Sequence, residues 1–196
     1  QRALELLDQK ALQANTNFIS GIPTLDPVDG TNKNSLVAIG QGKGIYSKQH
    51  LVPFGEYVPF ESVLRGLIGF FDLPMSRMSA GSPGQDSLTL AINGANFDVS
   101  PAICYEIAYG ESLRKRSINS SAIITVSNDT WFGPTNGPWQ HLQIARVRAL
   151  ENAKPVIRAT NNGITAVIDK NGIVVDKLPQ FTSDVLRSTV NLTQGR

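Results

Sequence analysis

The chain has 196 residues, of which 41% are hydrophobic, and this is enough to bury one substantial core, so a single domain is expected. Its 18 basic and 16 acidic side chains leave a net charge of only +2 without long charged runs, which argues against nucleic acid as a partner. No signal peptide is recognisable, and no apolar stretch reaches the roughly 20 residues that a helix needs to cross a bilayer.

The first half of the chain alternates short apolar segments with turn-forming clusters. Residues 2–14 predict an amphipathic helix, because Ala3, Leu4, Leu7, Ala11 and Leu12 fall near one face. Strands are predicted at 17–22, 35–39 and 44–52, with turns at 26–34 and 40–44, a helix at 61–71 and a loop at 76–86.

The second half alternates strands with helices. Strands are predicted at 96–103, 122–126 and 156–160, with helices at 110–116 and 139–153. The helix 139–153 is expected to turn Leu142, Ala145, Ala149 and Leu150 inward. Residues 164–169 and 172–176 predict a hairpin whose Asn171-Gly172 turn supplies positive φ angles. This order favours an α/β fold with helices packed on a sheet.

Cys104 is the only cysteine and therefore cannot form an internal disulfide within the chain. It follows the apolar run 99–103 and directly precedes Tyr105 and Glu106, where a strand would deliver a nucleophile to a sharp turn. A buried core cysteine is the plainer interpretation. A lysine and carboxylates elsewhere supply what a reactive thiolate needs.

Lys48 and Glu56 enclose an unusual segment, in which Pro53, Gly55 and apolar residues constrain the backbone between the two charges. Taken singly, each charged residue would be a solvated surface group. A constrained segment can instead aim both side chains at one site.

Three ordered motifs together resemble the nitrilase, or carbon–nitrogen hydrolase, superfamily. They are residues 48–56 (KQHLVPFGE), 103–106 (ICYE) and 127–133 (SNDTWFG). Within this superfamily, the chain resembles the branch that N-acylates lipoproteins. The resemblance lies in residues 50–59, in residues 137–141, and in residues 148–151 leading to 160–163. The resemblance covers nearly the whole chain and implies an αββα sandwich that lacks its N-terminal portion.

The resemblance implies a glutamate, lysine and cysteine triad supported by a second glutamate. By motif position, Cys104 is the nucleophile, Lys48 the cation near the oxyanion and Glu56 the supporting carboxylate. The Tyr105 N–H is a further oxyanion donor, and Glu106 either steadies the turn or is a surface carboxylate. The general-base glutamate is expected in a Trp-Pro-Glu-like segment, and none precedes Gln1.

Two further expectations concern the surroundings of the thiol. Trp131 and Phe132 either wall the acyl site or anchor a loop. An apolar group between Leu64 and Met75 either lines a lipid entrance or packs into a core. The two histidines, His50 and His141, are too few for a metal site, and no cofactor is implied.

The implied reaction moves an acyl chain from a phospholipid through a cysteine thioester to the amine of a diacylglyceryl-cysteine lipoprotein. The chain, residues 1–196, is then an interior piece of an enzyme at the extracytoplasmic face of the bacterial inner membrane. The flanking membrane helices are absent from it, and the isolated piece is expected to be inactive. Two alternatives stay open: a soluble amidase that passes the acyl group to water, and a non-enzymatic lipid-binding or scaffolding domain.

Overall fold

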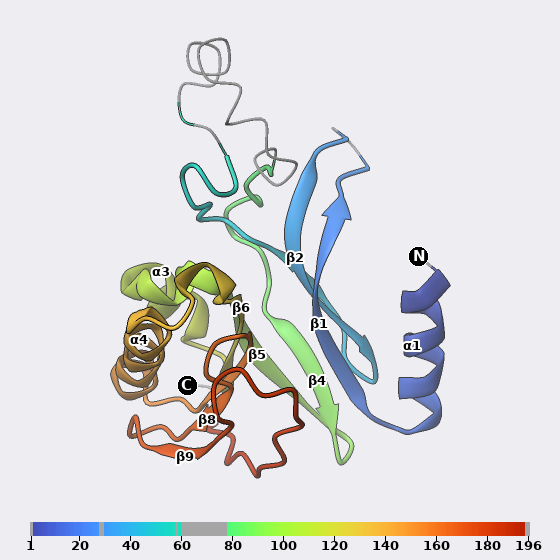
Figure 1. Ribbon diagram of the computed structural model, residues 1–196. Coiled ribbons are helices and arrows are strands. Elements are labelled where there is room, and N and C mark those ends of the chain that lie inside the picture. The colour runs from blue at the N-terminus through green and yellow to red at the C-terminus, as the bar shows by residue number, and fades with distance from the viewer. Residues whose placement is uncertain (1, 28–29, 58, 60–77, 195–196) are drawn as a thin grey trace.

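The computed structural model describes residues 2–27, 30–57, 59 and 78–194 (Figure 1). The predicted helix at 61–71 and the apolar group between Leu64 and Met75 lie outside these residues. The helices are α1 (Arg2–Gln13), α3 (Gly110–Ser117) and α4 (Gly137–Asn152), with 3-10 turns η3 (Cys104–Ala108) and η4 (Thr130–Phe132). The strands are β1 (Asn17–Leu25), β2 (Asn32–Gly40), β3 (Ile45–Ser47), β4 (Leu88–Ile92), β5 (Ala95–Ile103), β6 (Ala122–Asn128), β7 (Val156–Asn161), β8 (Ala166–Ile168) and β9 (Val174–Lys177).

The strands form two sheets that pack face to face. The smaller sheet has the order β1-β2-β3 and is antiparallel. The larger has the order β4-β5-β6-β7-β8-β9, in which β5, β6 and β7 are parallel and the other pairings are antiparallel. In Figure 1, α3 and α4 cover the outer face of the larger sheet and α1 lies beyond the smaller one.

Two hydrophobic cores separate these layers, and β6 contributes to both. Ile123 packs with residues of α3 and α4, whereas Ala122 and Ile124 pack with Leu36 and other residues of the smaller sheet. Successive residues of a strand point to opposite faces, so one apolar strand can fill both cores. The fold is therefore the expected αββα sandwich.

Strand β3 is shorter than predicted, because it ends at Ser47 rather than at residue 52. The N–H groups of Gln49 and His50, which a longer strand would give to a neighbouring strand, donate instead to the carboxylate of Glu106. A tertiary contact has thus replaced strand pairing. Strand β4 was not predicted, and it pairs with β5 through residues 88–92.

The hairpin between β8 and β9 forms, but its turn differs from the expected Asn-Gly turn. Only Gly172 of that pair has a positive φ angle, of 76°. The N–H of Asp169 donates to the carbonyl of Ile173, which leaves a three-residue loop with glycine in the left-handed position.

Within the described residues, the three predicted helices were correct in position but partly wrong in the faces that are buried. Leu150 of α4 is 61% exposed, because it lies about 100° around the helix from the buried Ala149. In α1 only Ala11 is buried, and Leu7 and Leu12 are exposed. None of the described helices has the length and apolar character to span a membrane.

Candidate active site

Cys104 occupies a strained position at the carboxyl end of β5. Its φ angle is +55°, a left-handed conformation that costs a residue with a β-carbon about 1 to 3 kcal/mol. The thiol is free and half-buried. Because β5 and β6 run parallel, the end of β6 at Asn128 lies at the same edge of the sheet. Ligands of α/β sheets bind at this kind of edge.

Lys48 follows β3 directly and is a buried cation. Its side chain is 1% exposed, and its Nζ lies 2.7 Å from Oε2 of Glu56. Its own N–H donates to the carbonyl of Asn34, and its carbonyl accepts from Gly81, each at 2.7 Å. A buried ammonium needs such a partner, since desolvation of an unpaired charge is prohibitive. The surface interpretation of Lys48 is therefore wrong.

Glu56 is oriented by more than the lysine. Oε2 also accepts the N–H of Val52 at 2.8 Å, and Oε1 accepts from the side-chain amide of Asn34. The two carboxylate oxygens are thus engaged by groups from β2 and from the loop itself. This arrangement fixes the direction in which the Lys48 ammonium is held.

Glu106 is a buried carboxylate, 1% exposed, that joins the two motif segments. Oε2 accepts the N–H of Ile103 at 2.9 Å, next to Cys104. Oε1 accepts the N–H of Gln49 at 2.8 Å, next to Lys48, and that of His50 at 3.2 Å. One side chain therefore fixes the main chain beside the thiol and beside the lysine, and the surface interpretation of Glu106 is wrong.

Tyr46 completes the surroundings of this carboxylate. Its hydroxyl donates to Oε1 of Glu106 at 2.8 Å, and Arg116 both donates to that hydroxyl and lies 5.0 Å from the ring centre. Burial, followed by the charge of Glu106, raises the pKa of Tyr46 far above its ordinary value. The hydroxyl thus stays protonated and remains a donor.

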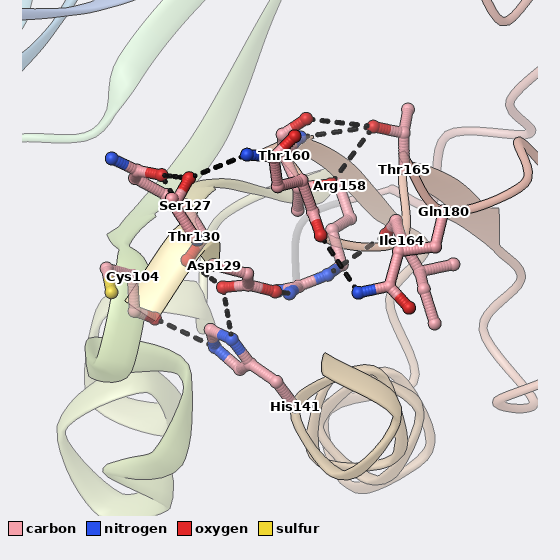
Figure 2. A network of polar contacts seen from close by, with 12 residues as sticks. Cys104, Ser127, Asp129, Thr130, His141, Arg158, Thr160, Ile164, Thr165 and Gln180 are labelled. Atoms are coloured by element: carbon pink, nitrogen blue, oxygen red, sulfur yellow. Dashed lines mark hydrogen bonds and ion pairs between the residues drawn. The ribbon is translucent and has the colours of Figure 1, made fainter. Parts of the chain in front are cut away.

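A second buried network reaches the carbonyl oxygen of Cys104 (Figure 2). His141 of α4 contacts the carbonyl oxygen of Cys104 through Nε2 at 3.2 Å and Oδ1 of Asp129 through Nδ1 at 3.0 Å. Arg158 of β7 donates to Oδ2 of Asp129 at 2.7 Å, and Ser127 donates to Oδ1 at 2.6 Å. The side chains of Asp129, His141 and Arg158 are all buried.

The electrostatics of this network keep Asp129 ionised. Burial acts to raise its pKa, but hydrogen bonds from His141 and Ser127 and the nearby positive charges outweigh burial, so the pKa lies below the ordinary value. Burial lowers the pKa of Arg158, an effect that the negative charge of Asp129 and the hydrogen bond to it oppose.

The remaining predicted residues lie at the surface near these networks. The Tyr105 ring is exposed and meets Tyr109 edge-on, with ring centres 5.9 Å apart. In η4, Trp131 is 75% exposed and Phe132 is also exposed. Their roles as oxyanion donor and as pocket wall stay predictions. Among the described residues, no group of three histidine, cysteine or acidic side chains is arranged to hold a metal ion.

Sequence reasoning missed the network of Asp129, His141 and Arg158. One signal was present, because Arg158 interrupts the otherwise apolar start of β7. A buried arginine requires a buried anion, and Asp129 at the end of the adjacent strand was a candidate. The contact between His141 and Cys104 had no such signal, since 37 residues separate the two.

Comparison with solved structures identifies the fold class of this sandwich. A carbon–nitrogen hydrolase from Helicobacter pylori matches with a TM-score of 0.66 and 16% identity, over 89% of this chain and 61% of that chain. A carbon–nitrogen hydrolase superfamily protein from Xanthomonas campestris matches with a TM-score of 0.62 and 17% identity, over 90% and 63% of the two chains. The fold is that of the nitrilase-like sandwich proteins. The family model described as carbon–nitrogen hydrolase matches residues 2–196, and the chain belongs to that family.

Similar sequences narrow the comparison further. Apolipoprotein N-acyltransferase of Pseudomonas aeruginosa (strain LESB58) is 45% identical over 195 residues, which is 98% of this chain and 37% of that protein. The protein of the same name from Pasteurella multocida (strain Pm70) is 46% identical over 199 residues, or 97% and 38%. This chain therefore spans less than two-fifths of the length of these relatives.

Proposed function

We propose that this chain carries the acyl-transfer site of an enzyme that N-acylates lipoproteins. The observation that carries the proposal is the Glu106 carboxylate, which binds the main chain beside Cys104 and beside Lys48 at once. A thiol and a buried ammonium on two main-chain segments that share one carboxylate suit acyl transfer. The similarity to proteins named apolipoprotein N-acyltransferase supports this substrate class.

In the first proposed step, the Cys104 thiolate attacks the ester carbonyl of a phospholipid and forms a carbon–sulfur bond. The ester carbon–oxygen bond then breaks. A carboxylate base first takes the proton of the thiol and then gives it to the departing lysophospholipid oxygen. By family resemblance this base is a glutamate outside this chain. The Lys48 ammonium and the Tyr105 N–H stabilise the oxyanion, and each such donor is worth about 3 to 4 kcal/mol.

In the second step, the amino group of a diacylglyceryl-cysteine lipoprotein attacks the thioester. A carbon–nitrogen bond forms, the carbon–sulfur bond breaks, and the proton lost by the amine returns to sulfur through the same base. Glu56 keeps the Lys48 ammonium in place for both oxyanions. Splitting the transfer into two steps replaces one difficult displacement with two easier ones.

Both substrates are lipids anchored in a bilayer, so the reaction belongs at a membrane surface. We place this part of the protein at the extracytoplasmic face of the bacterial inner membrane, with parts of the protein outside this chain providing the membrane anchor. The exposed rings of Trp131 and Phe132 are then suited to contact the acyl chain.

The experiment uses the full-length protein in phospholipid vesicles with a labelled acyl chain and a diacylglyceryl-cysteine peptide. Label should appear first on the peptide that contains Cys104 and then on the acceptor amine. Cys104→Ala should abolish both signals, whereas the exposed control Ser183→Ala should keep both. Unchanged transfer by Cys104→Ala would exclude the nucleophile assignment.

The same experiment separates the two alternatives. Label that passes from Cys104 to free fatty acid in the presence of acceptor identifies a hydrolase. Lipid binding without any acyl-cysteine identifies a binding or scaffolding domain. Residues 1–196 alone should give no measurable transfer, because the expected base is supplied from outside them, and phospholipid-dependent transfer by this piece would contradict that expectation.

A further inference from the structure

The carbonyl of Cys104 is fixed by a side chain from a distant helix. Figure 2 shows this oxygen pointing at the ring of His141, whose Nε2 lies 3.2 Å away. Helix α4 contains Pro138 in its first turn, which suits a helix start, and His141 follows on the face that packs against the sheet. The position of the imidazole is therefore set by the packing of α4.

Both ring nitrogens of His141 face hydrogen-bond acceptors. Nε2 faces a carbonyl oxygen, and Nδ1 faces a carboxylate oxygen of Asp129. A carbonyl oxygen can only accept a hydrogen bond, so the contact with Cys104 requires Nε2 to carry the donated proton. Asp129 in turn accepts from Ser127 and Arg158, so it cannot move without breaking buried bonds.

The conformation of Cys104 requires such support. A left-handed φ at a residue with a β-carbon persists only where the surroundings over-determine it. Glu106 fixes the chain on the N-terminal side, at the N–H of Ile103, and His141 fixes it on the C-terminal side, at the carbonyl of Cys104 itself. Together the two contacts define the direction of the sulfur.

Resting on the function proposed above, we propose that His141 is a positioning residue for the nucleophile. Its Nε2–H bond to the Cys104 carbonyl holds the residue in the left-handed conformation that presents the thiol to the acyl donor. Asp129, anchored by Arg158, fixes the imidazole so that this donor cannot turn away. His141 itself does not touch the reacting atoms.

Two amide substitutions separate the two bonds of the imidazole. In His141→Gln the side-chain NH2 reaches the position of Nε2 and can still donate to the Cys104 carbonyl. In His141→Asn the NH2 reaches only the position of Nδ1 and can donate only to Asp129. Gln140→Asn, at the preceding exposed position, serves as the control.

The first measurement is the rate at which iodoacetamide alkylates Cys104 in the full-length protein, followed by mass spectrometry of the peptide that contains it. His141→Asn should slow alkylation by about tenfold or more. Without the bond to its carbonyl, Cys104 relaxes from the left-handed conformation, and the strain relieved, about 1 to 3 kcal/mol, corresponds to a factor of that order. His141→Gln should stay within about threefold of the wild type. The same order is expected for the formation of acyl-Cys104.

The second measurement is stability in urea, and it should give the reverse order. His141→Gln loses the hydrogen bond with Asp129, whereas His141→Asn keeps a donor there, so the glutamine variant should unfold at the lower urea concentration. Reactivity that follows stability, or equal reactivity in the two variants, would overturn the positioning role. Because alkylation needs no lipid substrate, this result does not depend on whether acyl transfer is observed.

Discussion

Replacement of Glu106 by glutamine tests whether one carboxylate unites the two halves of the site. The two side chains have the same shape, but glutamine has one acceptor oxygen where glutamate has two. Among the described residues, Oε1 accepts from Tyr46, Gln49 and His50, whereas Oε2 accepts only from Ile103. The amide oxygen therefore takes the place of Oε1, and the new NH2 group faces the N–H of Ile103.

The expected loss of stability follows from this count. One hydrogen bond to a charged acceptor disappears, which is worth about 1.5 to 3 kcal/mol. The buried N–H of Ile103 is also left unsatisfied, at a further cost of about 1 to 3 kcal/mol. We expect a total of about 2.5 to 6 kcal/mol, a large fraction of the roughly 5 to 15 kcal/mol by which a domain is stable.

Urea unfolding of Glu106→Gln and of the control Glu111→Gln measures this difference. Glu111 is an exposed carboxylate on α3, so its replacement should leave the midpoint unchanged. Formation of acyl-Cys104 should fall by about 100-fold in Glu106→Gln, the effect typical of a small misplacement of reacting groups. A variant that unfolds and reacts like Glu111→Gln would refute the bridging role of Glu106.

Three further predictions concern the charges and the packing around the thiol. Lys48→Met should reduce the rate of acyl-enzyme formation from labelled phospholipid by about 100- to 1000-fold. The control Lys115→Met, at an exposed lysine, should leave this rate unchanged. Equal rates in the two variants would show that Lys48 has no part in the mechanism. Because the folded pKa of Asp129 lies below its ordinary value of about 4, its stabilisation is complete above that pH and is lost as the pH falls through the lower folded value. The unfolding free energy of the wild type should therefore fall more steeply below about pH 4 than that of Asp129→Asn, and parallel curves in urea titrations would contradict this assignment. Gly163→Ala should destabilise the fold by about 1 to 3 kcal/mol, because the new β-carbon would lie 2.3 Å from Oδ2 of Asp129. The control is Gly55→Ala, whose new β-carbon would meet its nearest atom at an ordinary contact distance of 3.6 Å. Thermal melts should show a lower midpoint for Gly163→Ala than for Gly55→Ala, and equal midpoints would contradict the prediction.

The order of helices and strands was predictable because it depends on local patterns. Apolar runs and turn residues located most of the strands, and α1, α3 and α4 begin and end within a few residues of the predicted ranges. The prediction of β3 failed where a distant group decides the outcome. Strand β3 ends early because Glu106 takes the N–H groups of Gln49 and His50, and no local pattern in residues 44–52 contains that information.

The sequence by itself determined the types of the chemical groups and their order: a lone cysteine after a buried strand, and a lysine and a glutamate on a constrained loop. Motif resemblance assigned their roles as expectations. Only the tertiary structure decided that Glu106 is shared between the two segments and that His141 supports the carbonyl of Cys104. The physical reason is that a hydrogen bond depends on distances of about 3 Å between atoms that packing brings together, whereas a sequence pattern records only neighbours along the chain.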